Sequence, residues 1–335
     1  MTPDLEKKVE DAKKIIRLSA EMSQHFYEKP VIICYFGGKD SDVILRLAME
    51  CLAPDEFEVL HAVTTVDSYV TNRHVNRVYK ELKDKGVKAE KTIPIGDDGQ
   101  PTNMWKLIVQ EGTPPTRLMR YCCRILKETS TPNRIAILGV RGSESTGRKG
   151  RDVFGIRGET REKAKFYTLD HTEEVFREAL EKEKEPGGEI WDCTFIKTMR
   201  EKKDTVANPI YDWTDNDVWD YLKGKKYPYN PMYDMGYHRV GCIGCPMATY
   251  RQKMKEFSDF PYVKKLYIQA FDKMREERRK AGKTHKYDAI WSSGESVYKW
   301  WIEENKHVTE GQMTIQSYLT DDMGLIVREP KKNDE

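Results

Sequence analysis

Apolar and polar positions follow two different periods along the chain. Residues 31–36 form an uninterrupted apolar run, VIICYF, which is typical of a strand buried on both faces. Apolar residues then recur every three or four positions over 40–51, which predicts a helix. The period changes at a pair of glycines, Gly37 and Gly38. The pattern therefore predicts a strand, a tight glycine turn and a helix in direct succession.

The same two periods continue through the first half of the sequence. A helix is expected over 5–28, ahead of the first strand. Further strands are expected over 58–66, 89–95 and 134–140, and further helices over 72–85 and 104–110. This alternation indicates an α/β fold with a doubly wound, mostly parallel sheet. Ligands bind such sheets at the carboxyl ends of the strands, where Gly38 and Gly139 fall.

The composition along the chain suggests four parts. These are an N-terminal helix (1–28), a main domain (29–250), a helical C-terminal region (251–325) and a disordered tail (326–335). Residues 143–188 are rich in Lys, Arg and Glu, so we expect an inserted surface element there, followed by a strand around Cys193. Within the helical region, 255–280 and 297–304 are amphipathic.

Length, charge and hydropathy narrow the class of protein. The chain has 335 residues, enough for a full hydrophobic core. Lys and Arg number 57 against 55 Asp and Glu, so bulk charge argues neither for nor against a nucleic-acid partner. The sequence contains no apolar run of membrane-spanning length and no signal-peptide pattern, so we expect a cytoplasmic protein without a membrane partner.

The glycine turn is a candidate anion site. Gly37 and Gly38 permit positive φ and a close approach of the backbone to a ligand. The helix that follows directs its unpaired N–H groups and positive dipole end at the same place, which suits a phosphate. The alternative is an ordinary strand-to-helix turn capped by Asp40 or Ser41. The stretch matches neither the Walker loop nor the three-glycine dinucleotide fingerprint.

Four of the seven cysteines form two close pairs. Cys122 and Cys123 are adjacent, and Cys242 and Cys245 form a C-x-x-C. Zinc and iron-sulfur clusters both accept four thiolates. Adjacent cysteines bind a single zinc awkwardly because their side chains diverge, whereas a cubane offers a separate iron to each sulfur. The alternative, cysteines as small apolar fillers, fits poorly with their charged and glycine-rich surroundings.

Several other residues fall at predicted strand ends. The stretch GVRGSESTGR places Arg141, Glu144 and Arg148 after the strand 134–140, where they could bind phosphates. Asp67 follows the strand 58–66. The segment 208–222 has a helix start at Thr214 or Asp215.

Five motifs in order resemble the phosphoadenosine phosphosulfate (PAPS) reductase family of the PP-loop ATP pyrophosphatase superfamily. They are FGGKDS (36–41), YCCRILKETSTP, GVRGSES with Arg148, NPIYDWTDNDVWDYL, and YNPMYDMGYHRVGCIGCP. The resemblance covers about residues 29 to 250 and implies the adenine nucleotide alpha hydrolase-like fold of that superfamily. Phe36 stands where the PP-loop usually has a serine.

The resemblance also implies a set of site residues. Lys39, Asp40, Ser41 and Arg141 would be catalytic, and the nucleotide would contact these together with Phe36, Gly37, Gly38, Asp67, Gly139, Glu144 and Arg148. By analogy with adenylyl-sulfate reductases, Cys122, Cys123, Cys242 and Cys245 would hold a 4Fe-4S cluster. ATP with Mg²⁺ is the expected second cofactor, and PAPS or adenylyl sulfate is the alternative ligand.

Within that family the sequence is nearest to the DndC-like sulfurtransferases, which implies an ATP-dependent, pyrophosphate-releasing enzyme. Its partners would be a sulfur donor such as a cysteine desulfurase, DNA or tRNA as acceptor, and a second copy of the chain. No cysteine follows Cys245, so a PAPS or adenylyl-sulfate reductase would need a thiol from Cys34, Cys51, Cys193 or a partner. A non-catalytic nucleotide-binding protein is the third hypothesis.

Overall fold

The structure is a computed structural model that describes residues 1–128, 133–144, 152–156, 166–184, 194–201, 204–283 and 287–303. The chain divides into two compact units. The first comprises Met1–Val63, Tyr69–Ile93 and Glu128–Gly241, and the second comprises Thr64–Ser68, Pro94–Lys127 and the chain from Cys242 onward.

The first unit is built on a seven-stranded sheet of order β3-β2-β1-β4-β7-β5-β6. Its strands are β1 (Val31–Cys34), β2 (Phe57–Ala62), β3 (Lys88–Thr92), β4 (Ile135–Ile137), β5 (Phe154–Ile156), β6 (Phe166–Tyr167) and β7 (Thr205–Ala207). The first five strands in this order are parallel, while β5 and β6 are antiparallel to their neighbours. The prediction of a mostly parallel α/β sheet is therefore confirmed.

The direction of winding reverses between β1 and β4. The chain runs from β1 outward to β2 and β3, and then returns to place β4 on the other side of β1. Ile33 of β1 accordingly pairs with Val59 on one side and Ile137 on the other. The loops that leave the carboxyl ends of β1 and β4 are neighbours at this reversal, which is where open α/β sheets bind ligands.

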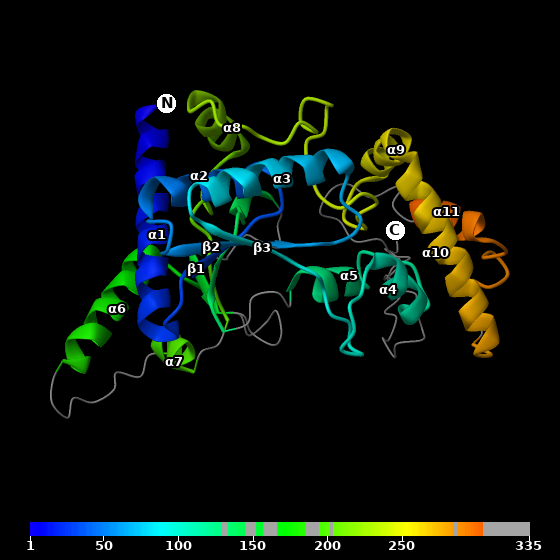
Figure 1. The fold of residues 1–335 in the computed structure, drawn as a ribbon, viewed down its shortest axis with the longest axis horizontal. Helices are drawn as coiled ribbons and strands as arrows, with labels where there is room; N and C mark the ends of the chain where they lie inside the picture. The colour runs from blue at the N-terminus through cyan, green and yellow to red at the C-terminus, as the bar shows by residue number, and fades with distance from the viewer. Residues whose placement is uncertain are drawn as a thin grey trace, which may run out of the picture. The chain divides into compact units, whose positions relative to one another are not determined.

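Helices flank this sheet. They are α1 (Pro3–Tyr27), α2 (Lys39–Cys51), α3 (Tyr69–Asp84), α6 (Leu169–Glu183), α7 (Thr194–Arg200) and α8 (Asp215–Gly224), with a short 3₁₀ turn η2 (Gly142–Glu144) after β4. Figure 1 shows α2 and α3 running along the same side of β1, β2 and β3. Alternate residues of β1 face opposite sides of the sheet, since Ile33 joins the main helix-covered core and Ile32 joins a smaller apolar cluster with Leu60 and Val206.

Local sequence signals explain where two of these helices begin. The Thr2 hydroxyl accepts from the amide of Leu5 at the start of α1, where Pro3 is the first helical residue. At α8, Thr214 and Asp217 form a reciprocal capping box, which confirms Thr214 as the cap. α8 is thus fixed at its N-terminus independently of Asp215.

The second unit consists of helices and connecting turns. They are α4 (Met104–Glu111), α5 (Tyr121–Cys123), a π-helical turn η1 (Arg124–Glu128), α9 (Tyr250–Asp259), α10 (Pro261–Lys280) and α11 (Gly294–Glu303). Buried aromatic rings pack at its centre, with Tyr267 against Trp301 at 4.7 Å and against Phe257 at 5.8 Å between ring centroids. None of the helices in the described part of the chain is long and apolar enough to cross a bilayer.

The structure differs from the sequence prediction in three places. The expected surface insertion over 143–188 instead adds β5 and β6 to the sheet and packs Val175 and Phe176 of α6 into the core. The amphipathic stretch expected over 255–280 is divided between two helices, because Pro261 starts a new one. A strand expected around Cys193 is wrong on its C-terminal side, where α7 begins at Thr194; Cys193 itself lies outside the described residues.

Element boundaries also differ, since β2, β3 and β4 are shorter than predicted. The polar residues Thr64 and Thr65 follow β2, and the exposed Ile93 follows β3. The predicted tail at 326–335 lies outside the described residues.

Candidate functional site

The glycine turn after β1 is held in one conformation by its own hydrogen bonds. Gly37 has φ +71°, and a Cβ there would lie 3.0 Å from Val75. The Gly38 amide donates to Ser41 Oγ over 3.1 Å, and Ser41 Oγ donates to the Gly38 carbonyl over 2.7 Å. The Asn230 side-chain amide donates to the Gly37 carbonyl over 2.8 Å. The turn is therefore preorganised at the N-terminus of α2.

Two buried cations meet at this turn. The side chains of Lys39 and Arg141 are 7% and 4% exposed. Arg141 Nε donates to Asp40 Oδ1 over 2.7 Å and Nη2 donates to Asp215 Oδ1 over 2.9 Å. Lys39 Nζ lies 3.0 Å from the same Asp215 oxygen and 3.6 Å from Asp40 Oδ2. The cluster joins α2, the loop after β4 and the start of α8.

The charges of this cluster shift the pKa of Asp215. Partial burial alone would raise that pKa, but the hydrogen bond from Lys39 and the positive charges of Lys39 and Arg141 outweigh burial and lower it. Asp215 is therefore ionised at neutral pH and acts as an anion toward both cations.

Tyr233 lies over the turn from the segment that follows α8. Its hydroxyl accepts a hydrogen bond from the Lys39 amide over 2.9 Å, and its ring centroid is 5.8 Å from Lys39 Nζ. Burial raises the pKa of Tyr233 despite the opposing hydrogen bond from Lys39, so the hydroxyl stays protonated at neutral pH. The sequence predicts that backbone amides at the start of α2 bind phosphate. One of them, the Lys39 amide, donates instead to the Tyr233 hydroxyl.

Gly139 permits the close approach of the loop after β4 to α2. A Cβ at this position would lie 3.0 Å from the backbone carbonyl carbon of Asp40 and 3.0 Å from the Asp40 Cβ. Any side chain would push the two segments apart and lengthen the Arg141–Asp40 contact. The glycine is therefore a steric requirement of the cluster.

The remaining predicted nucleotide residues have different positions. Phe36 packs on the smaller apolar cluster of the sheet, with its ring 6.4 Å from that of His61. Glu144 ends the 3₁₀ turn η2 after Arg141. Asp67 belongs to the second unit, where it accepts a hydrogen bond from Thr64 over 2.7 Å. Arg148 lies outside the described residues.

The four paired cysteines all lie in the second unit. Cys122 and Cys123 lie in α5, and the Cys245 amide donates to the Cys242 carbonyl to close the C-x-x-C turn. A hydrogen bond to Cys123 and then burial raise the pKa of Cys122 well above its usual range, and the charges of Cys242 and Cys245 raise it further. The same hydrogen bond lowers the pKa of Cys123. The two pairs are therefore close enough to influence one another's ionisation.

A partly buried lysine, Lys127, accompanies these cysteines. The charge of Cys242, and then those of Asp67, Cys245 and Cys123, raise the pKa of Lys127 against the opposing effect of burial. A cation kept protonated beside Cys242, Cys245 and Cys123 offsets the negative charge of a thiolate-bound cluster, so the donor set suits such a group. As the side chains stand, no three His, Cys, Asp or Glu residues of the described ranges are arranged to hold a metal ion.

The C-terminal helices hold the C-x-x-C turn. The Gly244 amide donates to Oε2 of the buried Glu256 over 2.7 Å, and Gln252 donates to Oε1 of the same carboxylate over 2.7 Å. The Tyr267 hydroxyl donates to the Ile243 carbonyl over 3.1 Å. Gly244 has φ +71°, and a Cβ there would lie 2.7 Å from Phe257. The turn is therefore built into the core of α9 and α10.

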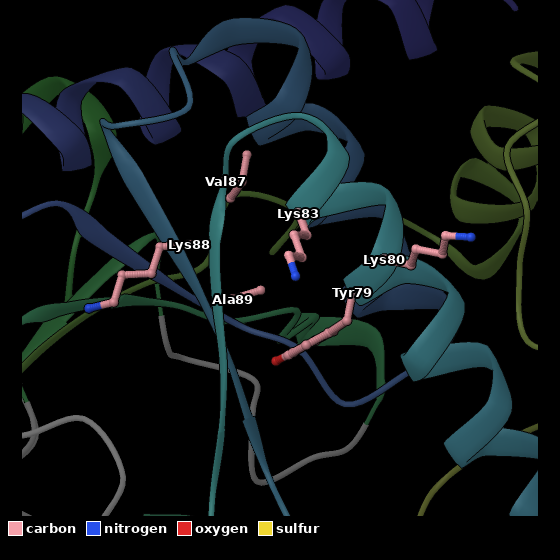
Figure 2. Close-up of a pocket in the computed structure, with 6 residues that line it drawn as sticks. All are labelled: Tyr79, Lys80, Lys83, Val87, Lys88 and Ala89. Carbon is pink, nitrogen blue, oxygen red and sulfur yellow. The ribbon is translucent and has the colours of Figure 1, made fainter.

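A separate hollow lies between α3 and β3, at the amino end of that strand. It is lined by Tyr79, Lys80, Lys83, Val87, Lys88 and Ala89. Figure 2 shows Lys80 and Lys88 pointing away from each other and away from the centre of the hollow. Because only one of its lysines, Lys83, points into the hollow, and because the hollow lies at the opposite end of the strands from the glycine turn, we assign it no role in the candidate site.

Sequence reasoning missed several residues of both clusters. It treated Asp215 only as a helix start, and it assigned no role to Asn230, Tyr233, Lys127 or Glu256. Asn230 and Tyr233 lie in the motif YNPMYDMGYHRVGCIGCP, so the motif was found but not the individual contacts. The sequence carries no local signal that links Glu256 to a turn twelve residues earlier.

Comparison with known proteins identifies the family. The model of the phosphoadenosine phosphosulfate reductase domain matches residues 30–248, so the chain belongs to this family. Two uncharacterised proteins of Methanocaldococcus jannaschii are 24% identical over 82% of the chain and 26% identical over 80% of it. These alignments cover 46% and 54% of the relatives, so the chain spans about half the length of the curated relatives it matches. An adenosine 5'-phosphosulfate reductase of Oceanobacillus iheyensis is 41% identical over 51 residues, which is 15% of this chain and 21% of that protein.

Solved structures resemble the chain at low sequence identity. A PAPS reductase from Candida auris in a phosphate complex has a TM-score of 0.41 at 12% identity, covering 72% of this chain and 96% of that one. A U34-tRNA thiolase from Methanococcus maripaludis with its 4Fe-4S cluster has a TM-score of 0.39 at 12% identity, covering 84% of this chain and 83% of that one.

Proposed function

We propose that this protein is an ATP-dependent, pyrophosphate-releasing sulfurtransferase of the DndC-like kind that carries a 4Fe-4S cluster. The observation that carries the proposal is the convergence of buried Lys39 and Arg141 at a glycine turn before α2. Two fixed cations and a helix N-terminus are the groups that stabilise the charge of a leaving pyrophosphate.

The residues at the glycine turn would have different roles in the reaction of ATP. Lys39 and Arg141 would bind phosphate oxygens, and Ser41 would keep the turn in shape through its two bonds to Gly38. Asp40 would hold Mg²⁺, since a carboxylate at this place suits a hard cation. An acceptor oxygen would attack the α-phosphorus, and the bond to the bridging oxygen would break so that pyrophosphate leaves with the electron pair. A sulfur donor would then displace AMP from the acceptor.

The paired cysteines are the proposed cluster ligands. Cys122, Cys123, Cys242 and Cys245 would hold the 4Fe-4S cluster, and Lys127 would offset part of its negative charge. When bound, such a cluster supplies iron that can accept electrons or a sulfur ligand. The chain's own contribution is to fix the C-x-x-C turn through Glu256 and Tyr267.

The proposed partners follow from this reaction. The acceptor would be DNA, tRNA or a small molecule, and the sulfur donor would be a protein such as a cysteine desulfurase. The protein would act in the cytoplasm, as a homo-oligomer with a second copy of itself. Asp67, Glu144 and Arg148 stay candidates for nucleotide contact.

The second candidate is a PAPS or adenylyl-sulfate reductase. The family match and the short, 41% identical match to an adenosine 5'-phosphosulfate reductase favour it. In this candidate the nucleophilic thiol would come from Cys34, Cys51, Cys193 or a partner. In a third candidate, the turn holds a nucleotide without catalysis.

One assay separates the three candidates. Anaerobically purified protein is incubated with ATP and Mg²⁺ in the presence of DNA, tRNA or no acceptor, and pyrophosphate is measured. The same protein is incubated with PAPS or adenylyl sulfate and a thiol reductant, and sulfite is measured. We expect pyrophosphate that depends on an acceptor. Sulfite without pyrophosphate would establish the reductase, and neither product together with tight ATP binding would establish the non-catalytic protein.

A further inference from the structure

We propose that Asp215 is an internal competitor for the phosphate site, so that an incoming polyphosphate must displace its carboxylate from Lys39 and Arg141. The inference rests on the proposed function, because it takes the glycine turn to be a polyphosphate site. It adds a residue that controls the affinity of that site.

The geometry at Asp215 is that of an anion on a cation pair. A single carboxylate oxygen, Oδ1, accepts from Arg141 Nη2 over 2.9 Å and lies 3.0 Å from Lys39 Nζ. Both cationic side chains are more than nine-tenths buried. A phosphate oxygen that bridged the same two donors would occupy the position of Oδ1.

The two carboxylates of the cluster differ in how firmly they are held. Asp40 is 19% exposed and pairs with Arg141 through Nε, a separate donor from the one that reaches Asp215. Asp215 is 59% exposed and can reach water by rotating its side chain. The buried cations therefore stay in place, while the carboxylate that covers them is free to leave.

Helix α8 does not depend on Asp215. Its N-terminus is closed by the capping box of Thr214 and Asp217, and its buried face consists of Val218, Tyr221 and Leu222. The side chain of Asp215 can therefore swing out without moving the helix. This makes Asp215 a replaceable occupant of the cation pair and not a structural support of it.

The simpler explanation is that Asp215 is an acidic residue in the first turn of a helix, where the dipole favours it. That role predicts a small effect on stability and none on anion affinity. Competition for the site instead predicts a clear effect on anion affinity, because an incoming phosphate must displace the Asp215 carboxylate from Lys39 and Arg141.

The test measures binding of inorganic pyrophosphate by isothermal titration calorimetry to the full chain, with EDTA present to remove divalent cations. Asp215→Asn and Asp215→Ala are compared with the native sequence and with Asp220→Asn, which removes an exposed charge from the same helix. We expect both Asp215 variants to bind at least about fivefold more tightly, and Asp220→Asn to bind as the native chain does. Equal or weaker binding by both Asp215 variants overturns the proposal.

Thermal unfolding and ATP turnover complete the test. Both Asp215 variants should have unfolding temperatures within a few degrees of that of the native chain, since the side chain is exposed. If one variant unfolds at a much lower temperature, the pyrophosphate affinity of the other variant is the one compared with the native chain. Tighter pyrophosphate binding without pyrophosphate release from ATP would support the competitor and contradict the proposed function. Normal release from ATP with unchanged pyrophosphate affinity would contradict only the competitor.

Discussion

Arg141 and Asp40 are 101 positions apart in the sequence, yet Arg141 Nε donates to Asp40 Oδ1 over 2.7 Å. The contact links the loop after β4 to the first turn of α2, across the point where the sheet reverses its winding. It also fixes the guanidinium so that Nη2 is aimed at the place where we expect a phosphate oxygen. The first prediction follows from the two separate donors, Nε and Nη2, that Arg141 uses at once.

Replacing Arg141 by lysine should weaken ATP binding although the positive charge is kept. A lysine cannot bond Asp40 and a phosphate oxygen from two separate nitrogens at once, whereas the guanidinium can. Loss of one charge-assisted hydrogen bond corresponds to about 1.5–3 kcal/mol, or about ten- to a hundredfold in the dissociation constant for ATP. Native-like affinity of Arg141→Lys in a calorimetric titration would mean that charge alone matters there.

Gly139→Ala tests the steric requirement behind the same contact. The new methyl group would lie about 3.0 Å from the Asp40 backbone, so α2 or the loop must shift. We expect a loss of about 1–3 kcal/mol in the free energy of unfolding, measured by urea denaturation, together with weaker ATP binding. Gly224→Ala is the control, because its nearest neighbour is the flexible Met1 side chain at 3.7 Å and the residue ends α8. Equal stability of the two variants would contradict the role of Gly139.

Much of the first site could be predicted because its signals are local. The glycine turn, the start of α2 and the cap of α8 each depend on a few consecutive residues, and the structure shows all three. The pairing of Arg141 with Asp215 could not be predicted in the same way, because 74 residues separate them and the contact depends on the order of the strands.

The errors in the fold prediction also have physical causes. The high charge of residues 143–188 hid the buried stripe of α6, which needs only Val175, Phe176 and Ala179 to pack on the core. The break before α10 follows from Pro261, which cannot continue the hydrogen bonding of α9 but is well suited to start a helix. Average composition is a poor guide where three or four residues decide burial.

The paired cysteines should be separable from the others by substitution. Serine at any one of Cys122, Cys123, Cys242 or Cys245 should abolish the brown colour and the absorption at roughly 400 nm of anaerobically prepared protein. Cys34→Ala and Cys51→Ala should keep the colour, because Cys34 is buried in β1 and burial raises the pKa of Cys51 to about 11, which leaves it a neutral thiol. Colourless native protein with stoichiometric zinc would contradict the assignment of a cluster.

Substitution of Cys193 distinguishes the sulfurtransferase from the reductase. Cys193→Ala should leave pyrophosphate release unchanged even if it slows the transfer of sulfur. If this variant instead loses the ability to form sulfite from PAPS or adenylyl sulfate, the reductase is the better account.

Glu256→Ala should lower the iron content per chain, because the Gly244 amide loses its acceptor and the C-x-x-C turn is freed. Glu256→Gln keeps an acceptor for that amide and should restore most of the iron. The pair of variants separates positioning of the turn from a general loss of stability, which is followed by thermal unfolding of the metal-free protein. Equal iron in all three proteins would show that the turn forms without Glu256.

The central claim is that the glycine turn binds the phosphates of ATP and assists the departure of pyrophosphate. Its most direct test is the initial rate of pyrophosphate release from ATP, measured with an acceptor that supports release by the native protein. The native protein is compared with Lys39→Ala and with the control Lys83→Ala, which replaces an exposed lysine on α3. We expect kcat/KM to fall about ten- to a hundredfold in Lys39→Ala, with its iron content unchanged, and to stay at the native value in Lys83→Ala. Unchanged pyrophosphate release by Lys39→Ala would contradict the account.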